Sequence, residues 1–198
     1  MKAAVYSRPA KPLVIPVRRR RDFEALPKAA PVEIVAVDKA TECHVTPPEV
    51  AARMVGYLDC IGDYQTLEPS AGTGNLSRAL LAAGHSRYEL TQVERHHRLA
   101  SGLYQFGAVI NRCFLEYAAE ARGKVQFLNV VMNPPFSEVR KHVAAALSLM
   151  GRNGHDESPC LVALVPVTFR HPSAEELETL PSDTFATAKV HTKIIRIR

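Results

Sequence analysis

Short strand-like runs alternate with amphipathic, helix-like segments along most of this 198-residue chain. Apolar residues three and four positions apart mark the helical segments, whereas short runs rich in β-branched and aromatic residues have the pattern of strands. The five core runs with this pattern are QTLEP, YELTQVE, AVINR, VQFLNVVM and CLVALVPVTF. Strands that alternate with helices form mostly parallel sheets with helices on both faces. The chain therefore predicts an α/β fold.

Further elements extend this pattern at both ends. Residues 32–37 alternate as a short strand, TPPEVAARMVGYLDC predicts a helix over residues 49–60, and AKVHTKIIRIR alternates as a last strand. Between them, NLSRALLAAG predicts a helix that ends at Gly84, and EVRKHVAAALSLM predicts one that stops at Gly151. A hydrophobic content of 46% in a chain of this length suits one domain with a proper core. We predict that this domain covers residues 32–198.

The first 31 residues form a basic, proline-rich arm. They hold eight lysines and arginines, two acids and five prolines, so the arm carries a net charge of +6 and the rest of the +5 chain carries −1. This composition resists a packed core and predicts an extended lead-in. One interpretation is a solvated tail, and the other is an arm that binds nucleic-acid phosphates through Arg18, Arg19, Arg20 and Arg21.

Cysteine spacing and hydropathy exclude several other classes of protein. The four cysteines lie far apart, no C-x-x-C pair is present, and the N-terminus has no secretory apolar region. We therefore expect a cytoplasmic protein without disulfides. No second ligand pair stands at zinc spacing from Cys43 and His44, so no metal is expected. The longest apolar run, residues 161–167, is too short to span a bilayer.

The stretch LEPSAGTGN follows the first core strand and opens a helix. Open α/β sheets bind nucleotide-like ligands at this place, at the carboxyl ends of their strands. Gly72 and Gly74 allow the backbone to approach a ligand closely, and Thr73 or Asn75 can cap the helix. Ser77 stands where the dinucleotide fingerprint has its third glycine, which counts against a pyrophosphate cofactor.

An acidic residue ends the second core strand. Glu94 lies 22 residues after Gly72, and a carboxylate at this position can accept hydrogen bonds from both hydroxyls of a ribose. The alternative is that Glu94 only forms an ion pair with Arg95 or Arg98.

The fourth core strand stops abruptly in the sequence VVMNPPF. Pro134 and Pro135 cannot donate to a strand ladder, and Pro134 also favours an extended backbone at Asn133. The asparagine amide is therefore held at a strand end beside the aromatic ring of Phe136. This arrangement predicts a rigid polar clamp with a stacking platform. The alternatives are that the prolines only terminate a strand and that Phe136 only packs in the core.

Together, these motifs resemble the class I S-adenosylmethionine-dependent methyltransferases, and more closely their N6-adenine branch with an Asn-Pro-Pro-Phe motif. The resemblance runs from about Thr46 to Arg198. It implies a Rossmann-like fold with a mostly parallel seven-stranded sheet and S-adenosylmethionine as cofactor. By their place in these motifs, the residues implied to bind the cofactor are Thr46, Pro47, Glu68, Ala71, Gly72, Gly74, Asn75, Glu94, Cys113 and Phe114, and those implied in catalysis are Asn133, Pro134, Pro135 and Phe136.

One position departs from the family pattern. The family often carries an acidic residue after the third strand, where it binds the adenine amino group of the cofactor, but this chain has Cys113 there. Phe114 can still pack on the adenine ring. The same hydrogen bond is therefore not expected from Cys113.

The resemblance implies methyl transfer to the N6 amine of adenine, with DNA as the expected partner and a monomer or weak dimer as the expected state. RNA adenine, protein glutamine and a cofactor-binding protein without turnover remain alternatives. Direct reading of several base pairs needs side chains placed in a groove. The sizeable segments available for this are residues 151–159 and 170–183, so we expect low sequence specificity.

Overall fold

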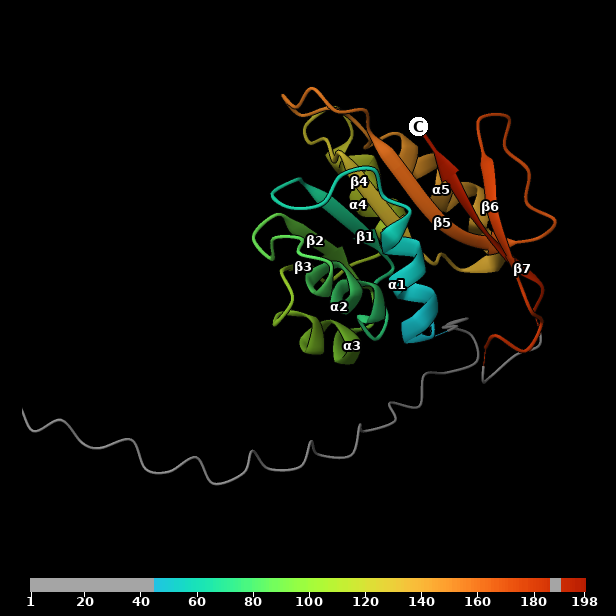
Figure 1. The fold of residues 1–198 in the computed structure, drawn as a ribbon. Helices are drawn as coiled ribbons and strands as arrows, with labels where there is room; N and C mark the ends of the chain where they lie inside the picture. The colour runs from blue at the N-terminus through green and yellow to red at the C-terminus, as the bar shows by residue number, and fades with distance from the viewer. Residues whose placement is uncertain (1–44, 186–189) are drawn as a thin grey trace, which may run out of the picture. The chain divides into compact units, whose positions relative to one another are not determined.

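The computed structural model describes residues 45–185 and 190–198 (Figure 1). The predicted basic arm with its four consecutive arginines, and the strand predicted over residues 32–37, lie outside the described residues. Their roles and the predicted domain boundary at residue 31 therefore stay predictions.

The described chain alternates strands and helices from its first helix to its fifth strand. The elements, in chain order, are α1 (Pro48–Gly56), β1 (Thr66–Pro69), α2 (Asn75–Ala82), β2 (Leu90–Val93), α3 (His97–Leu103), β3 (Ala108–Ile110), α4 (Phe114–Ala121), β4 (Asn129–Met132), the short 3-10 helix η2 (Phe136–Glu138), α5 (Val139–Leu147), β5 (Cys160–Pro166), β6 (Glu175–Leu180) and β7 (Thr192–Ile197).

The strands form one seven-stranded sheet in the order β3-β2-β1-β4-β5-β7-β6. The pairs from β3 to β5 are all parallel, whereas β7 runs antiparallel to both of its neighbours, β5 and β6. The sheet is therefore mostly parallel with an antiparallel edge. This confirms the predicted Rossmann-like fold class.

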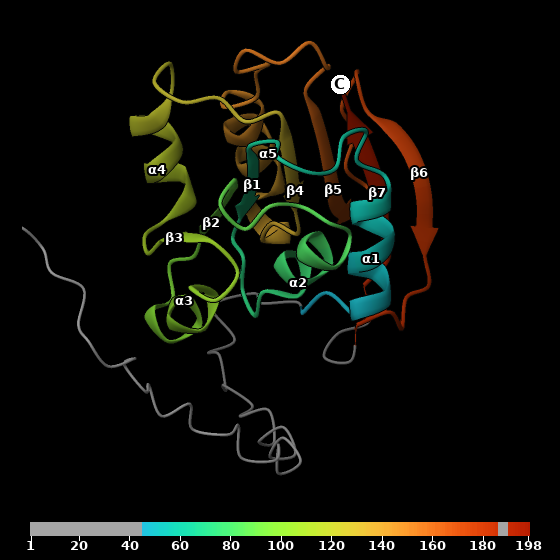
Figure 2. The same ribbon diagram turned by 60° about the vertical axis from the view of Figure 1, so that its left-hand side comes forward.

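Helices cover both faces of the sheet, as Figures 1 and 2 show. Apolar side chains of α1, α2 and α3 form one core cluster, and those of α4 and α5 form a second. Strand β4 supplies both clusters, because Val131 points to the first and its neighbours Val130 and Met132 point to the second. A strand buried on both faces has a continuous apolar sequence, which is why VVM and CLVALV contain no polar residue.

The antiparallel edge corrects one sequence-based interpretation. Residues 170–183 were a candidate segment for contacting a substrate, but Glu175–Leu180 within it forms the edge strand β6. Its acids pair with basic side chains of the molecule itself. Glu176 bonds to the buried Lys193, Glu175 to Arg196 at 2.7 Å, and Glu178 to Arg53 at 3.2 Å.

The loop over residues 151–159 was the other candidate segment for contacting a substrate, and its place in the topology does not favour this role. The loop precedes β5, so it lies at the amino ends of the parallel strands. There it bonds to the segment before β1, through Asn153 to Gln65 and through Glu157 to Tyr64 at 2.9 Å. Ligands of open α/β sheets bind at the opposite edge.

Candidate functional site

The sheet order reverses between β1 and β4, and the loops after these two strands separate at their carboxyl ends. A crevice at such a switch point is the usual ligand site of an open α/β sheet. A cavity of about 170 Å³ lies at this edge. Among the residues proposed from the sequence, those that line it are Thr46, Glu68, Ala71, Gly72, Asn75, Glu94, Cys113, Phe114, Asn133 and Pro135.

The loop between β1 and α2 is fixed to the end of β2. The backbone N–H of Ala71 donates to the Val93 carbonyl at 3.0 Å, and the N–H of Gly72 donates to the Glu94 carboxylate at 2.8 Å. Gly72 has a φ of 55°, and Ser70 has a φ of 57°, which is uncommon for a residue with a side chain. These bonds hold the loop in a compact turn against the cavity.

Gly74 has a different role from the one expected. It does not line the cavity, and a Cβ atom added to it would meet Leu103 Cδ2 at 2.8 Å and Phe106 Cε2 at 2.9 Å. Its φ of 77° makes it the left-handed N-cap of α2. A side chain at this position would therefore crowd Leu103 at the end of α3 and Phe106 just after it. The predicted caps, Thr73 and Asn75, are wrong, because α2 has no side-chain cap and Asn75 is its first residue.

The Glu94 carboxylate organises the backbone on both sides of it. One oxygen accepts the Gly72 N–H and the other accepts the His96 N–H at 2.7 Å. The structure does not pair this carboxylate with Arg95 or Arg98, so that alternative interpretation is wrong. A carboxylate offers about four lone-pair sites, so it can still accept hydrogen bonds from a ligand in the cavity.

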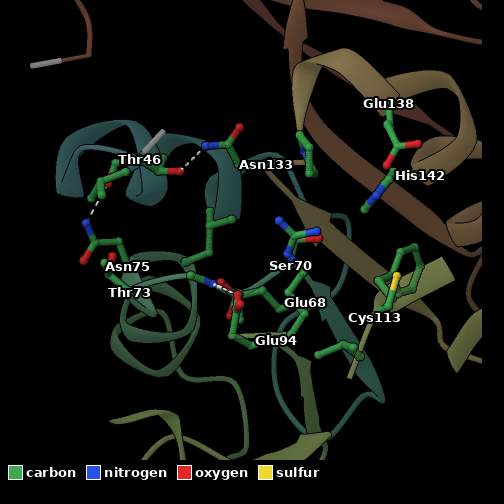
Figure 3. A pocket seen from close by; sticks show the side chains of 18 of the residues that line it. Thr46, Glu68, Ser70, Thr73, Asn75, Glu94, Cys113, Asn133, Glu138 and His142 are labelled. Carbon is green, nitrogen blue, oxygen red and sulfur yellow. Dashed lines mark hydrogen bonds between the residues drawn. The ribbon is translucent and has the colours of Figure 1, made fainter. Parts of the chain in front are cut away.

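Thr46 connects two parts of the cavity wall (Figure 3). Its backbone carbonyl accepts a hydrogen bond from Asn75 Nδ2 at 2.6 Å, and its hydroxyl accepts one from Asn133 Nδ2 at 2.9 Å. Thr46 is buried, whereas the Asn75 and Asn133 side chains that it holds are half-buried and line the cavity. The neighbouring Pro47, which was also expected to bind the cofactor, lies outside this cavity and lines a second, more open one beside Pro48 and Asp183.

The NPPF motif ends β4 as expected, and η2 begins at Phe136. The Asn133 amide nitrogen Nδ2 donates to the Thr46 hydroxyl, and the carbonyl Oδ1 is the other edge of the amide. Pro134, the second residue of the motif, is buried and does not line the cavity. Phe136 does not line it either, because its ring packs edge-on against Phe185 with centroids 6.2 Å apart.

The far end of the cavity lies between the start of α4 and the start of α5. Phe114 is buried, and its ring lies against the His142 imidazole with centroids 5.6 Å apart. Burial lowers the pKa of His142, so this imidazole is neutral at pH 7. The Lys141 ammonium bonds to Glu138 at 2.8 Å and lowers the pKa of that carboxyl. Figure 3 shows Glu138 and His142 on the side of the cavity where Cys113 lies.

Sequence reasoning missed Ser137, Glu138 and His142, although all three line the cavity. One signal was available. Val139, His142, Val143 and Ala146 are the buried residues of α5 at helical spacing, so a histidine stands on the apolar face of this helix. A polar residue on a buried face needs a partner or a ligand.

No group of three or more His, Cys, Asp and Glu residues that could hold a metal ion occurs in the part of the chain that the structure describes. Within residues 45–185 and 190–198, no helix is both long and apolar enough to cross a membrane.

No protein-family model and no curated protein matches this sequence. Solved structures do match. The 23S rRNA methyltransferase ErmE is 20% identical with a TM-score of 0.63, over 79% of this chain and 69% of that one. A type I restriction-modification methyltransferase subunit from Streptococcus thermophilus is 14% identical with a TM-score of 0.64, over 78% of this chain and 44% of that one.

A dimethyladenosine transferase from Plasmodium falciparum is 15% identical with a TM-score of 0.58, over 78% of this chain and 62% of that one. This chain therefore spans less than two thirds of the length of the last two proteins. Similarity at this level of identity shows the fold. The described domain has the fold of the class I methyltransferases.

Proposed function

We propose that this protein is an S-adenosylmethionine-dependent methyltransferase that methylates the exocyclic N6 amine of adenine in DNA. One observation carries the proposal. Thr46 holds the loop region after β1 through Asn75 and also holds the NPPF motif through Asn133. In an enzyme of this class, one of these elements binds the methyl donor and the other binds the methyl acceptor.

The cavity residues fit the proposed cofactor. Glu94 has acceptor capacity left for ribose hydroxyls, and Gly72, with no Cβ, lets the backbone of the loop approach a ligand closely. Phe114 offers an aromatic surface at the far end, where a purine ring can pack. When bound, S-adenosylmethionine supplies an electrophilic methyl group on a positively charged sulfur atom. Pro47 and Gly74 would support this site from outside the cavity.

The clamp explains how a weak nucleophile reacts. An adenine amine is a poor nucleophile because its lone pair is delocalised into the ring. Two acceptors, Asn133 Oδ1 and the Pro134 backbone carbonyl, would hold both amine protons and turn the lone pair toward the methyl group. Fixed dipoles and correct positioning lower the barrier without a strong base. The hydrogen bond to Thr46 would help to hold the Asn133 side chain in place beside the acceptor.

The target base would have to leave the duplex stack to reach Asn133. We propose that Phe136 stacks on the base. Its ring already packs on Phe185, so the base would extend an existing aromatic pair.

An adenine in RNA is the second candidate acceptor, since the likeness to a 23S rRNA methyltransferase and to a dimethyladenosine transferase supports it. A competition assay decides between acceptors. The protein is incubated with cofactor labelled on the methyl group and with equal amounts of duplex DNA, structured RNA and a glutamine-containing protein. We expect label in DNA. Label in RNA alone would shift the proposal to the second candidate, and label in protein alone would contradict both.

The basic arm is proposed to contact phosphates. Removing residues 1–21 should then reduce DNA affinity and flatten the dependence of log affinity on log salt by about 0.9 for each lost phosphate contact. Affinity measured over a series of salt concentrations gives this slope. The matched control is the full-length protein with Arg18, Arg19, Arg20 and Arg21 replaced by glutamine, which should lose most of the same slope. An unaltered slope in both proteins would show that the arm is a solvated tail.

Low sequence specificity is the expected behaviour of this chain. Each base pair that is read directly contributes about 1–3 kcal/mol of discrimination, and reading needs a surface beside the target base. Both segments considered for this purpose are largely used elsewhere, residues 151–159 at the opposite edge of the sheet and residues 175–180 as β6. Mapping N6-methyladenine across a genome after expression should therefore show modification in many contexts. One fully modified motif of four or more defined bases would contradict this.

A further inference from the structure

A buried chain of polar side chains lies directly beneath the loop after β1. Glu68 of β1 and Gln92 of β2 are opposite each other in the parallel pair, and Ser77 of α2 bonds to both. All three side chains are almost completely buried, at 1% exposure or less. Glu68 also lines the cavity, so this series of hydrogen-bonded side chains connects the candidate cofactor site to the core.

The hydrogen in each of these hydrogen bonds can be assigned, starting from Gln92. Gln92 Nε2 donates to the Leu103 carbonyl at 3.2 Å, so the amide oxygen is the atom that faces Ser77. This Oε1 lies 2.6 Å from Ser77 Oγ and can only accept. The single hydroxyl hydrogen of Ser77 is therefore committed to Gln92.

The remaining contact, between Ser77 Oγ and Glu68 Oε2, needs a hydrogen of its own. An ionised carboxylate has no hydrogen to give. If Ser77 donated to an ionised Glu68 instead, its oxygen would face Gln92 Oε1 at 2.6 Å with no hydrogen between them. Only a protonated Glu68 satisfies both contacts.

We propose that Glu68 is a neutral carboxylic acid that donates its proton to Ser77, and that it fixes the loop after β1 as a hydrogen-bond donor. The direction of donation then runs from Glu68 to Ser77, from Ser77 to Gln92 and from Gln92 to the end of α3. A continuous chain of this kind stabilises the junction of β1, β2 and α2 on which the candidate cofactor loop rests.

The combined effect of burial and of the neighbouring groups on the pKa of Glu68 supports this assignment. Burial raises the pKa of Glu68 to about 8, and the nearby Glu94 carboxylate acts in the same direction. The Ser77 hydrogen bonds and the Arg78 guanidinium act in the opposite direction but do not outweigh burial. The pKa in the folded state is therefore above its ordinary value of 4.5, so folding takes up a proton.

Carboxyl-carbon NMR of protein labelled at the glutamate side chains tests the proposal without any substitution. We expect one glutamate resonance to stay protonated at pH 7 and to titrate near pH 8 or above. This resonance should be missing in Glu68→Gln, whose introduced amide can donate to Ser77 in the same way. Titration of every glutamate below about pH 6 would overturn the proposal.

Denaturation provides a second readout. A raised folded-state pKa gives a stabilisation that is complete below about pH 4.5 and is lost as the pH rises to about 8. The free energy of unfolding of the wild type should therefore fall over this range relative to Glu68→Gln. Parallel pH profiles for the two proteins would contradict a neutral Glu68.

A consequence for ligand binding follows, and it rests on the proposed function. S-adenosylmethionine carries a sulfonium charge that S-adenosylhomocysteine lacks. Above pH 8, an ionised Glu68 at the cavity wall would favour the cation, so the affinity ratio of the two ligands should rise through this pH in the wild type relative to Glu68→Gln. The comparison of the two proteins cancels the titration of the ligands themselves.

The outcomes of this comparison are distinct. An identical pH dependence of the ratio in both proteins would show that Glu68 does not sense the ligand charge. Failure of both proteins to bind either ligand would contradict the proposed function, while the NMR titration would still decide the protonation state of Glu68.

Discussion

Asn133→Ala is expected to reduce the rate of methyl transfer by about 10²–10³-fold while the affinity for S-adenosylmethionine stays close to that of the wild type. This is the loss that follows when one preorganised polar group of an active site is removed. Asn133 lies in the wall of the cavity next to Thr46, and its amide is the group placed to hold the acceptor amine. Single-turnover kinetics and calorimetry measure the two quantities separately.

Two matched variants sharpen this prediction. Asn133→Asp keeps an acceptor at the same position, so it should retain more activity than Asn133→Ala. Thr46→Val removes the hydroxyl that holds Asn133 Nδ2 but keeps the backbone carbonyl that holds Asn75, so it should lower the rate less than Asn133→Ala does. Activity of Asn133→Ala within a few-fold of the wild type would contradict the clamp.

Glu94→Ala is expected to weaken cofactor binding by at least about tenfold. The carboxylate accepts two backbone hydrogen bonds that shape the loop after β1 and is proposed to accept ribose hydroxyls as well. Each hydrogen bond to a charged group contributes about 1.5–3 kcal/mol, and 1.4 kcal/mol corresponds to tenfold in affinity. Calorimetry below the melting temperature of the variant measures the loss.

Glu94→Gln is the matched control. The variant has one amide oxygen in place of the two carboxylate oxygens, so it can replace the acceptor of only one of the Gly72 and His96 N–H groups, and we expect an intermediate affinity. Unchanged affinity in Glu94→Ala would show that the ligand does not bind beside this carboxylate.

The sequence predicted the parallel half of the fold because its strands alternate with helices, and because the central strands β4 and β5 are buried on both faces and carry the unbroken apolar runs VVM and CLVALV. Strand β6 was missed for a physical reason. A register shift between Glu176 and Glu178 disrupts the two-residue alternation, and the acids of the strand are explained only by the basic side chains of β7 and α1. Pairing across an irregular edge is a tertiary feature that local periodicity does not contain.

The candidate site was predicted where a motif carried it and missed where only packing did. The motifs indicated Gly72, Glu94 and Asn133, which line one cavity. His142 comes from a helix with no motif, and only the packing of α5 against Phe114 brings it to the cavity. The position of Gly74 outside the cavity could not be predicted, because its close approach to Leu103 and Phe106 depends on tertiary packing.

Nucleoside analysis of the methylated product identifies the atom that receives the methyl group and the part that Asn133 has in the transfer. The protein is incubated with S-adenosylmethionine labelled on its methyl group and with unmethylated duplex DNA, and the DNA is digested to nucleosides and separated by mass. We predict label in N6-methyladenine with the wild type and a loss of about 10²–10³-fold in its rate of formation with Asn133→Ala. Label at a ring nitrogen of adenine or on cytosine, or equal labelling by both proteins, would contradict it.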